Sequence, residues 1–114
     1  MGTLVADAEA IMDALDMKDA LFVGLSIGGL IAQGLASKRM DLVRAMVLSN
    51  TAAKIGNRAM WEERIALART DGLEPIADMS MERWFSKGFA ASPEVEPWRD
   101  MYLTTHVEGL CGCA

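Results

Sequence analysis

The sequence predicts an α/β fold organised around one β-α-β unit, and three segments support this prediction. Ala20 to Val23 is a short uncharged run, typical of a strand that is buried on both faces. Leu30 to Ser37 follows as a helix of small residues, and Val43 to Ser49 ends in a second apolar run. Strand, helix and strand within about 30 residues form a parallel pair, whose crossover we expect to be right-handed.

An amphipathic helix is expected before this unit. Thr3 is a candidate N-cap, and the helix is predicted to continue to about Met17. Its apolar residues recur at helical spacing, so they are expected to face the core. They are Leu4, Ala8, Ile11 and Leu15. Lys18 and Asp19 are predicted to form the turn into the first strand.

The character of the chain changes after Asn50. The second half contains no strand pattern, and helices are predicted at residues 60–69, 73–85 and 94–105. We therefore expect two parts, 1–50 with the β-α-β unit and 51–114 as a helical region, with the break near residues 51–58.

Composition indicates a small globular protein and disfavours several partners. The 114 residues are 52% hydrophobic and 24% charged, and the formal net charge is −5. Without a basic stripe, this charge disfavours nucleic acid and anionic membranes as partners. No apolar run is long enough to span a bilayer, and no signal peptide is recognisable, so a cytoplasmic location is expected. Cys111 and Cys113 are expected to be free thiols, because two ligands do not make a zinc site.

Gly24-Leu25-Ser26-Ile27-Gly28 matches the pattern G-x-S-x-G. In a strand-turn-helix context, this pattern holds a nucleophilic serine on a tight, strained turn. Ser26 is thus the candidate nucleophile, and the backbone N–H of Ile27 is the candidate donor to an oxyanion. Glycine at both flanking positions is expected because a side chain there would collide across the turn. Two alternatives have less support. An incidental serine in a glycine-rich turn would not explain the strand before it and the helix and second strand after it. A phosphate-binding turn is disfavoured because no phosphate-binding pattern is present.

The other members of a catalytic triad are harder to assign. In hydrolases with this turn, an acidic residue and then a histidine follow the serine along the chain. The only histidine is His106, which is predicted to be a bystander at a helix end, because no strand precedes it. Asp71, Asp78 and Asp100 fit exposed positions better than the role of the acid. We therefore expect the chain to be an interior piece of a larger hydrolase, and inactive by itself.

Several segments resemble the 3-oxoadipate enol-lactonases of the α/β-hydrolase superfamily. The resemblance begins at the G-x-S-x-G turn and extends over nearly the whole chain. It rests on LVRAMVLSNTAAKIG from Leu42, WEERIAL from Trp61, Arg83-Trp84-Phe85 and Glu108-Gly109-Leu110. It implies a partial α/β-hydrolase fold, with a nucleophile elbow followed by a helical cap region. The triad acid and histidine would then lie beyond Ala114.

The resemblance also implies an activity. A serine hydrolase of this family opens a small enol-lactone to 3-oxoadipate in aromatic catabolism by the β-ketoadipate pathway, without a cofactor or metal. Ser26 and Ile27 would be its catalytic positions in this chain. Apolar cap residues could line the pocket, although at helical spacing they are more often ordinary core; they are Trp61, Trp84, Met60, Met79 and Met81. The carboxylate of the substrate would need a local cation, for which there are four candidates: Arg58, Arg64, Arg69 and Arg83.

Two alternatives remain open at this point. The chain could instead belong to another lactonase, esterase or perhydrolase with the same turn. A different hypothesis is that the 114-residue chain is a non-catalytic, self-associating piece. In a complete sheet, each of its two strands would have a hydrogen-bonded neighbour on both sides. Unpaired apolar strand edges favour pairing with another copy, so a homo-oligomer is expected.

Overall fold

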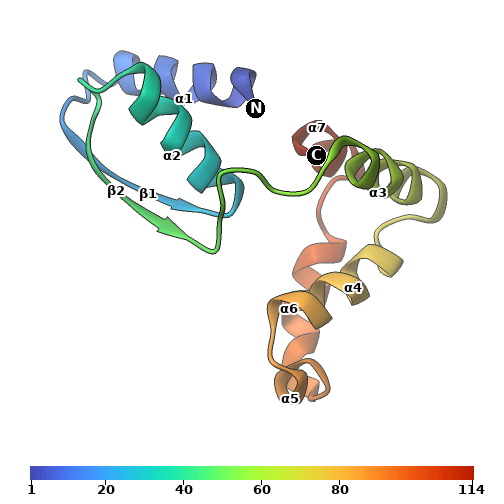
Figure 1. Ribbon diagram of the computed structural model, residues 1–114. Helices are drawn as coiled ribbons and strands as arrows, with labels where there is room; N and C mark the ends of the chain where they lie inside the picture. The colour runs from blue at the N-terminus through green and yellow to red at the C-terminus, as the bar shows by residue number, and fades with distance from the viewer. The chain divides into compact units, whose positions relative to one another are not determined.

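The computed structural model describes residues 1–114, which divide into two compact units, Met1–Ile55 and Gly56–Ala114 (Figure 1). The first unit contains α1 (Gly2–Ala14), β1 (Ala20–Leu25), α2 (Ile27–Lys38) and β2 (Val43–Ser49). The second is helical throughout, with α3 (Arg58–Asp71), α4 (Glu74–Trp84), α5 (Lys87–Ala90), a 3-10 turn at Pro93–Val95, α6 (Glu96–Leu103) and α7 (Val107–Cys113). The absence of strands from this half agrees with the sequence-based prediction.

The first unit is the predicted β-α-β unit. β1 and β2 pair in parallel, with Ala20 opposite Val43 and Leu25 opposite Ser49. α2 connects the two strands and packs on one face of the sheet, where Leu35 and Leu42 are fully buried. β1 extends two residues further than predicted, because Gly24 and Leu25 also pair with β2. An α/β fold is therefore confirmed.

The N-terminal helix buries a face that only partly coincides with the predicted one, since Ala8 packs against the core as expected. α1 begins after Met1, which places Thr3 within the first turn rather than at the N-cap. Val5 and Met12 are buried in the core, whereas Ile11 and Leu15 are exposed. The reason lies in α2: Gly34 has no side chain, and a Cβ placed there would lie 2.6 Å from Cγ2 of Val5. This close approach turns the Val5 side of α1 toward α2.

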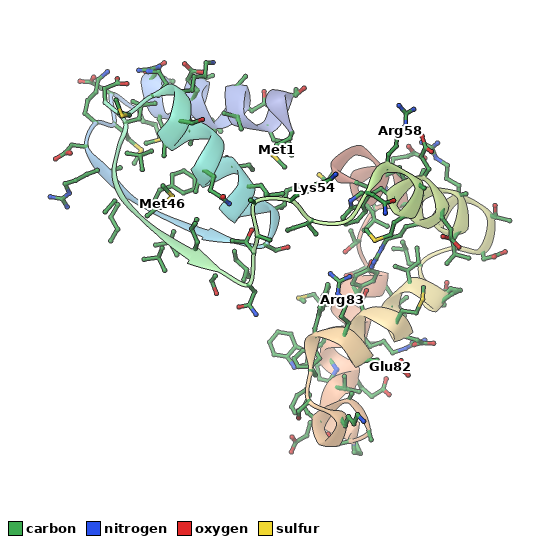
Figure 2. The ribbon with its side chains drawn as sticks, in the orientation of Figure 1. Met1, Met46, Lys54, Arg58, Glu82 and Arg83 are labelled. Atoms are coloured by element: carbon green, nitrogen blue, oxygen red, sulfur yellow. The ribbon has the colours of Figure 1, made fainter.

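One face of the sheet has no cover within its own unit. Leu21, Val23 and Leu25 alternate along β1 on the side away from α2, and each is more than half exposed. Val47 of β2 lies opposite Val23 and is also exposed. In Figure 2, side chains stand out from both sides of the two strands, including that of Met46. The sheet is thus apolar on both faces, but covered on only one.

The helical unit has its own core. α3, α4, α6 and α7 contribute to it, and its buried residues include Ala68, Ile76, Met81 and Tyr102. Asn57 caps α3 by accepting a hydrogen bond from the backbone N–H of Met60 (3.0 Å).

The predicted helix boundaries in this unit need correction. The helix expected at 94–105 is a 3-10 turn followed by α6, since Pro97 occupies the first turn of a new helix. Two short helices, α5 and α7, were not predicted because neither is long enough to show a periodic pattern. None of the helices has both the length and the apolar character needed to cross a membrane.

Candidate active site

Ser26 occupies a strained turn between the end of β1 and the start of α2. Its backbone angles are φ 53° and ψ −116°, a conformation that residues with a side chain rarely adopt. Hydrogen bonds on both sides hold it there. The Ser26 N–H donates to the carbonyl of Ser49 (3.0 Å), and the Ser26 carbonyl accepts from the N–H of Gly29 (3.0 Å) and from Oγ1 of Thr51 (2.7 Å). The side chain of Ser26 is left exposed to solvent.

The structure assigns different roles to the glycines around Ser26. A Cβ on Gly24 would lie 2.4 Å from the carbonyl oxygen of Gly28, so no side chain fits there. A Cβ on Gly28 would meet nothing within 4 Å, so the expectation of a collision at this second motif position is wrong. The second glycine under steric constraint is Gly29, where a Cβ would lie 2.4 Å from Cγ2 of Thr51.

Ile27 is the first residue of α2, and its N–H points out of a helix N-terminus. None of the chain's own acceptors is bonded to this N–H. The unpaired amides of a first helical turn carry partial positive charge, which favours an anion at this position. An exposed hydroxyl next to a helix-terminal N–H without a partner is an arrangement compatible with a nucleophile and one oxyanion donor.

Two residues that support this turn were missed by the sequence analysis. Thr51 follows β2, and Gln33 of α2 donates through Nε2 to the carbonyls of Gly29 (3.0 Å) and Ala52 (3.1 Å). Since the carboxyl ends of parallel strands meet at one edge of a sheet, the residues after β2 were candidates to lie beside the elbow. The identity of the contact, a side-chain hydroxyl on the Ser26 carbonyl, has no signature in the sequence.

His106 and the three aspartates all belong to the helical unit, where none of the aspartates is hydrogen-bonded to His106. His106 is exposed at the N-cap of α7, and its side chain makes no capping hydrogen bond. Asp71 ends α3, Asp78 accepts a hydrogen bond from Arg99 (2.7 Å), and Asp100 is exposed on α6. Within the first unit, no side chain is hydrogen-bonded to the hydroxyl of Ser26, so this unit by itself assigns no base.

The four candidate arginines of the helical unit differ in their partners. Arg58 is paired with Glu62 (2.7 Å) and Arg69 with Glu108 (3.0 Å), and the Arg69 guanidinium lowers the pKa of the Glu108 carboxyl. Arg58 lies on the outer side of α3 in Figure 2. Arg64 instead donates through Nη2 to two neutral oxygens, Oγ of Ser80 (2.8 Å) and the hydroxyl of Tyr102 (3.2 Å). Arg83 is exposed.

The residues considered as an apolar pocket lining are divided between core and surface. Met81 is buried in the helical core, whereas Met79 and Trp84 are about half exposed. Met60 and Trp61 are half-buried. Cys111 is buried and Cys113 exposed, and both are free thiols. No group of three or more His, Cys, Asp or Glu side chains is arranged to hold a metal ion.

Comparison with known proteins gives the geometry of Ser26 its context. The sequence profile of the α/β hydrolase fold matches residues 1–72, which include both strands and the whole elbow. The chain belongs to the α/β-hydrolase family.

Two curated relatives come from Acinetobacter baylyi. The chain is 42% identical to "3-oxoadipate enol-lactonase 2" over 112 residues, covering 96% of this chain and 42% of the relative. It is 34% identical to "3-oxoadipate enol-lactonase 1" over 83 residues, covering 73% of this chain and 31% of the relative. The chain therefore spans less than half the length of the curated relatives it matches.

Solved structures give a consistent result. An enol-lactonase from Burkholderia xenovorans LB400 matches with a TM-score of 0.86 and 36% identity, over 98% of this chain and 44% of that one. A hydrolase from Pseudomonas aeruginosa PA01 matches with a TM-score of 0.85 and 35% identity, over 96% of this chain and 42% of the hydrolase. A thermophilic esterase from Thermogutta terrifontis is more distant, with a TM-score of 0.77 and 27% identity, over 94% and 42%. The fold is therefore a partial α/β-hydrolase fold.

Proposed function

We propose that this chain carries the nucleophile elbow and the cap region of a serine hydrolase that opens 3-oxoadipate enol-lactone to 3-oxoadipate. The observation that carries the proposal is the backbone of Ser26, held at φ 53° beside the free N–H of Ile27. The identity to two relatives named as 3-oxoadipate enol-lactonases supports the substrate. As part of the same proposal, the enzyme works in the cytoplasm, in aromatic catabolism by the β-ketoadipate pathway.

The proposed reaction is acyl transfer to Ser26 and then to water. Oγ of Ser26 attacks the lactone carbonyl as a base removes its proton, and the oxyanion accepts a hydrogen bond from the Ile27 N–H. The ring C–O bond then breaks and releases an enol, which becomes a ketone by tautomerisation while its acyl end stays on Ser26. Water hydrolyses that ester and regenerates the serine. This sequence requires no metal or redox cofactor.

A chimera tests Ser26 in the context of a complete enzyme. Residues of this chain would replace the matching 42% of the Acinetobacter baylyi 3-oxoadipate enol-lactonase 2, to which they are 42% identical. We expect the chimera to hydrolyse the enol-lactone, and Ser26→Ala to lower kcat at least ~10⁴-fold, as loss of a serine nucleophile does. Ser37→Ala is the matched control, because Ser37 is an exposed serine further along α2. An active Ser26→Ala chimera would refute the proposal.

The isolated chain is proposed to be inactive, because no base of the unit that carries Ser26 is bonded to its hydroxyl. The measurement is hydrolysis of a small activated ester by the 114-residue chain and by its Ser26→Ala variant. We expect the two rates to be equal. A rate that depends on Ser26 would show that a working base exists in the chain or its oligomer, and His106→Ala would then be the next variant to make.

A second proposal, for the behaviour of the isolated chain, is self-association. It is supported by the uncovered sheet face with Leu21, Val23 and Leu25, and by two strands that each have a single neighbour. Sedimentation at increasing concentration should detect dimers or larger species, and Val23→Lys should shift the population toward monomer. Ile11→Lys is the control for adding a charge at an exposed apolar site outside the sheet. A chain that is folded and monomeric at high concentration contradicts this proposal.

A further inference from the structure

We propose that Arg64, Ser80 and Tyr102 form a binding site for the carboxylate of the substrate. The three side chains come from α3, α4 and α6 of the helical unit. Nη2 of Arg64 donates to Oγ of Ser80 at 2.8 Å and to the hydroxyl of Tyr102 at 3.2 Å. This assignment rests on the proposed function, since it concerns a lactone that carries a carboxylate group.

The charge of Arg64 has no anionic partner in the protein. Its side chain is half-buried, Ser80 and Tyr102 are buried, and no carboxylate forms an ion pair with it. A partly buried guanidinium bonded only to neutral oxygens is poorly compensated, so a bound anion would stabilise it.

Hydrogen-bond donors are also in surplus around Arg64. A guanidinium has five N–H donors, and the two bonds in the structure both come from Nη2. The N–H groups on Nε and Nη1 are therefore free to donate. Ser80 and Tyr102 each accept from Arg64, which leaves their own hydroxyl protons to be donated. A carboxylate, with two oxygens and about four lone-pair directions, matches this set of donors.

The other three candidate arginines are less suited to this role. Arg58 and Arg69 are already paired with glutamates, and a ligand would have to displace an existing ion pair at each. Arg83 is exposed and is not held by neighbouring hydroxyls, so binding would have to order a long flexible side chain. Arg64 is the one of the four that is held in place without being neutralised.

An aromatic surface adjoins the site. The ring of Trp84 packs against that of Tyr102, with 5.6 Å between the ring centroids, and Trp84 is about half exposed. It offers an apolar surface next to the donors, as a small ring with a carboxylate side chain would require. It also provides a fluorescent reporter close to the site.

The test is a titration of the 114-residue chain with adipate, followed by calorimetry and by tryptophan fluorescence. Adipate is a stable dicarboxylate, and dimethyl adipate is the neutral control. We expect saturable binding of adipate and none of the diester. Arg64→Gln should weaken adipate binding about tenfold or more, because at least one charge-assisted hydrogen bond is lost. Arg83→Gln makes the same change of charge on α4 and should leave binding unchanged.

Two conservative variants keep the test valid if Arg64→Gln fails to fold. Tyr102→Phe removes only a hydroxyl, and Arg64→Lys keeps the charge but loses the planar fork. Each should fold, as circular dichroism would verify, and each should weaken adipate binding severalfold. Absence of saturable binding by the wild-type chain, or unchanged affinity in all three variants, would overturn the proposal.

The experiments can show separately whether the carboxylate site is wrong and whether the proposed lactonase activity is wrong. Adipate binding does not need the nucleophile, so Ser26→Ala should bind adipate as the wild type does. Binding that depends on Arg64, with a chimera that cannot hydrolyse the lactone, would leave the carboxylate site standing and remove the proposed activity. A chimera that needs Ser26, but whose KM is unchanged by Arg64→Lys, would keep the activity and remove the site.

Discussion

Replacing Gly24 with alanine should severely destabilise the first unit. The new Cβ would lie 2.4 Å from the carbonyl oxygen of Gly28, 2.6 Å from its carbonyl carbon and 2.7 Å from Cα of Gly29. All three are backbone atoms of the first turn of α2, so no rotamer change relieves the overlap. Carbon atoms in contact normally lie about 3.5–4.0 Å apart, so strand and helix would have to separate by about 1 Å.

The expected loss in the free energy of unfolding is large compared with the total stability of the unit. Overpacking a rigid site costs typically 1–3 kcal/mol, and sometimes more. Because every contacted atom is backbone, we expect about 3 kcal/mol or more for Gly24→Ala. A unit of 55 residues, Met1–Ile55, has a total stability of roughly 3–8 kcal/mol at the usual value per residue. The substitution therefore removes a large part of it.

Gly28→Ala is the matched control within the same motif. A Cβ at Gly28 meets nothing within 4 Å, and the residue lies inside α2, where alanine is favoured over glycine by up to about 1 kcal/mol. Urea denaturation followed by circular dichroism measures both variants. We expect a large loss of stability for Gly24→Ala and none for Gly28→Ala. Equal losses at the two positions would refute the account of the elbow given by the structure.

Three further predictions concern the same unit. Ser26→Gly should raise the free energy of unfolding by about 1 kcal/mol, because glycine adopts φ 53° without the strain of a side chain, and a denaturation curve no more stable than that of the wild type would contradict this. Thr51→Val should cost about 1 kcal/mol through the lost hydrogen bond to the Ser26 carbonyl, measured in the same way, with Thr70→Val on α3 as the control. The side-chain hydrogen bond to Arg39 lowers the pKa of the Asp41 carboxyl from 3.8 to about 2. Hydrogen bonds to Lys38 and, to a lesser degree, Arg39 lower the pKa of the Glu9 carboxyl below its ordinary value of 4.5. These carboxylates are bound more tightly when ionised, so their contribution is present above pH 4–5 and is lost as the pH falls toward 2. The stability difference between the wild type and Arg39→Met should therefore shrink over that interval, and a difference independent of pH would exclude this explanation.

Much of the fold could be predicted because local patterns and long-range contacts agree. β1 is an uncharged run flanked by turn residues, and Ala20 and Phe22 on one of its faces pack into the core beside α2. Its other face is exposed, so the expectation of a strand buried on both faces is wrong for this unit. α1 is an exception, because two apolar stripes run along it and its sequence does not say which one faces the core. Gly34 on another helix decides in favour of Val5. The short helix α5 is similarly set by its cap rather than by periodicity, because Oγ of Ser86 accepts from the Phe89 N–H (3.4 Å).

The candidate site was predictable in part for the same reason. Ser26 and Ile27 lie within five consecutive residues whose chemistry determines the turn, so the sequence alone is enough to name them as candidates. Thr51 lies 25 residues after Ser26 and reaches it only through the pairing of β2 with β1. The choice of Arg64 among four arginines depends on ion pairs made by the other side chains, and these exist only in the folded unit.

Whether Ser26 is the nucleophile is decided by the rate of enol-lactone hydrolysis by the chimeric enzyme with and without the Ser26 hydroxyl. Ser26→Ala changes one atom of the elbow and leaves the Ile27 N–H in place, so loss of rate reports on the nucleophile alone. The proposed mechanism predicts that kcat falls at least ~10⁴-fold in a chimera that remains folded. A folded Ser26→Ala chimera that still hydrolyses the lactone within tenfold of the parent chimera would contradict it.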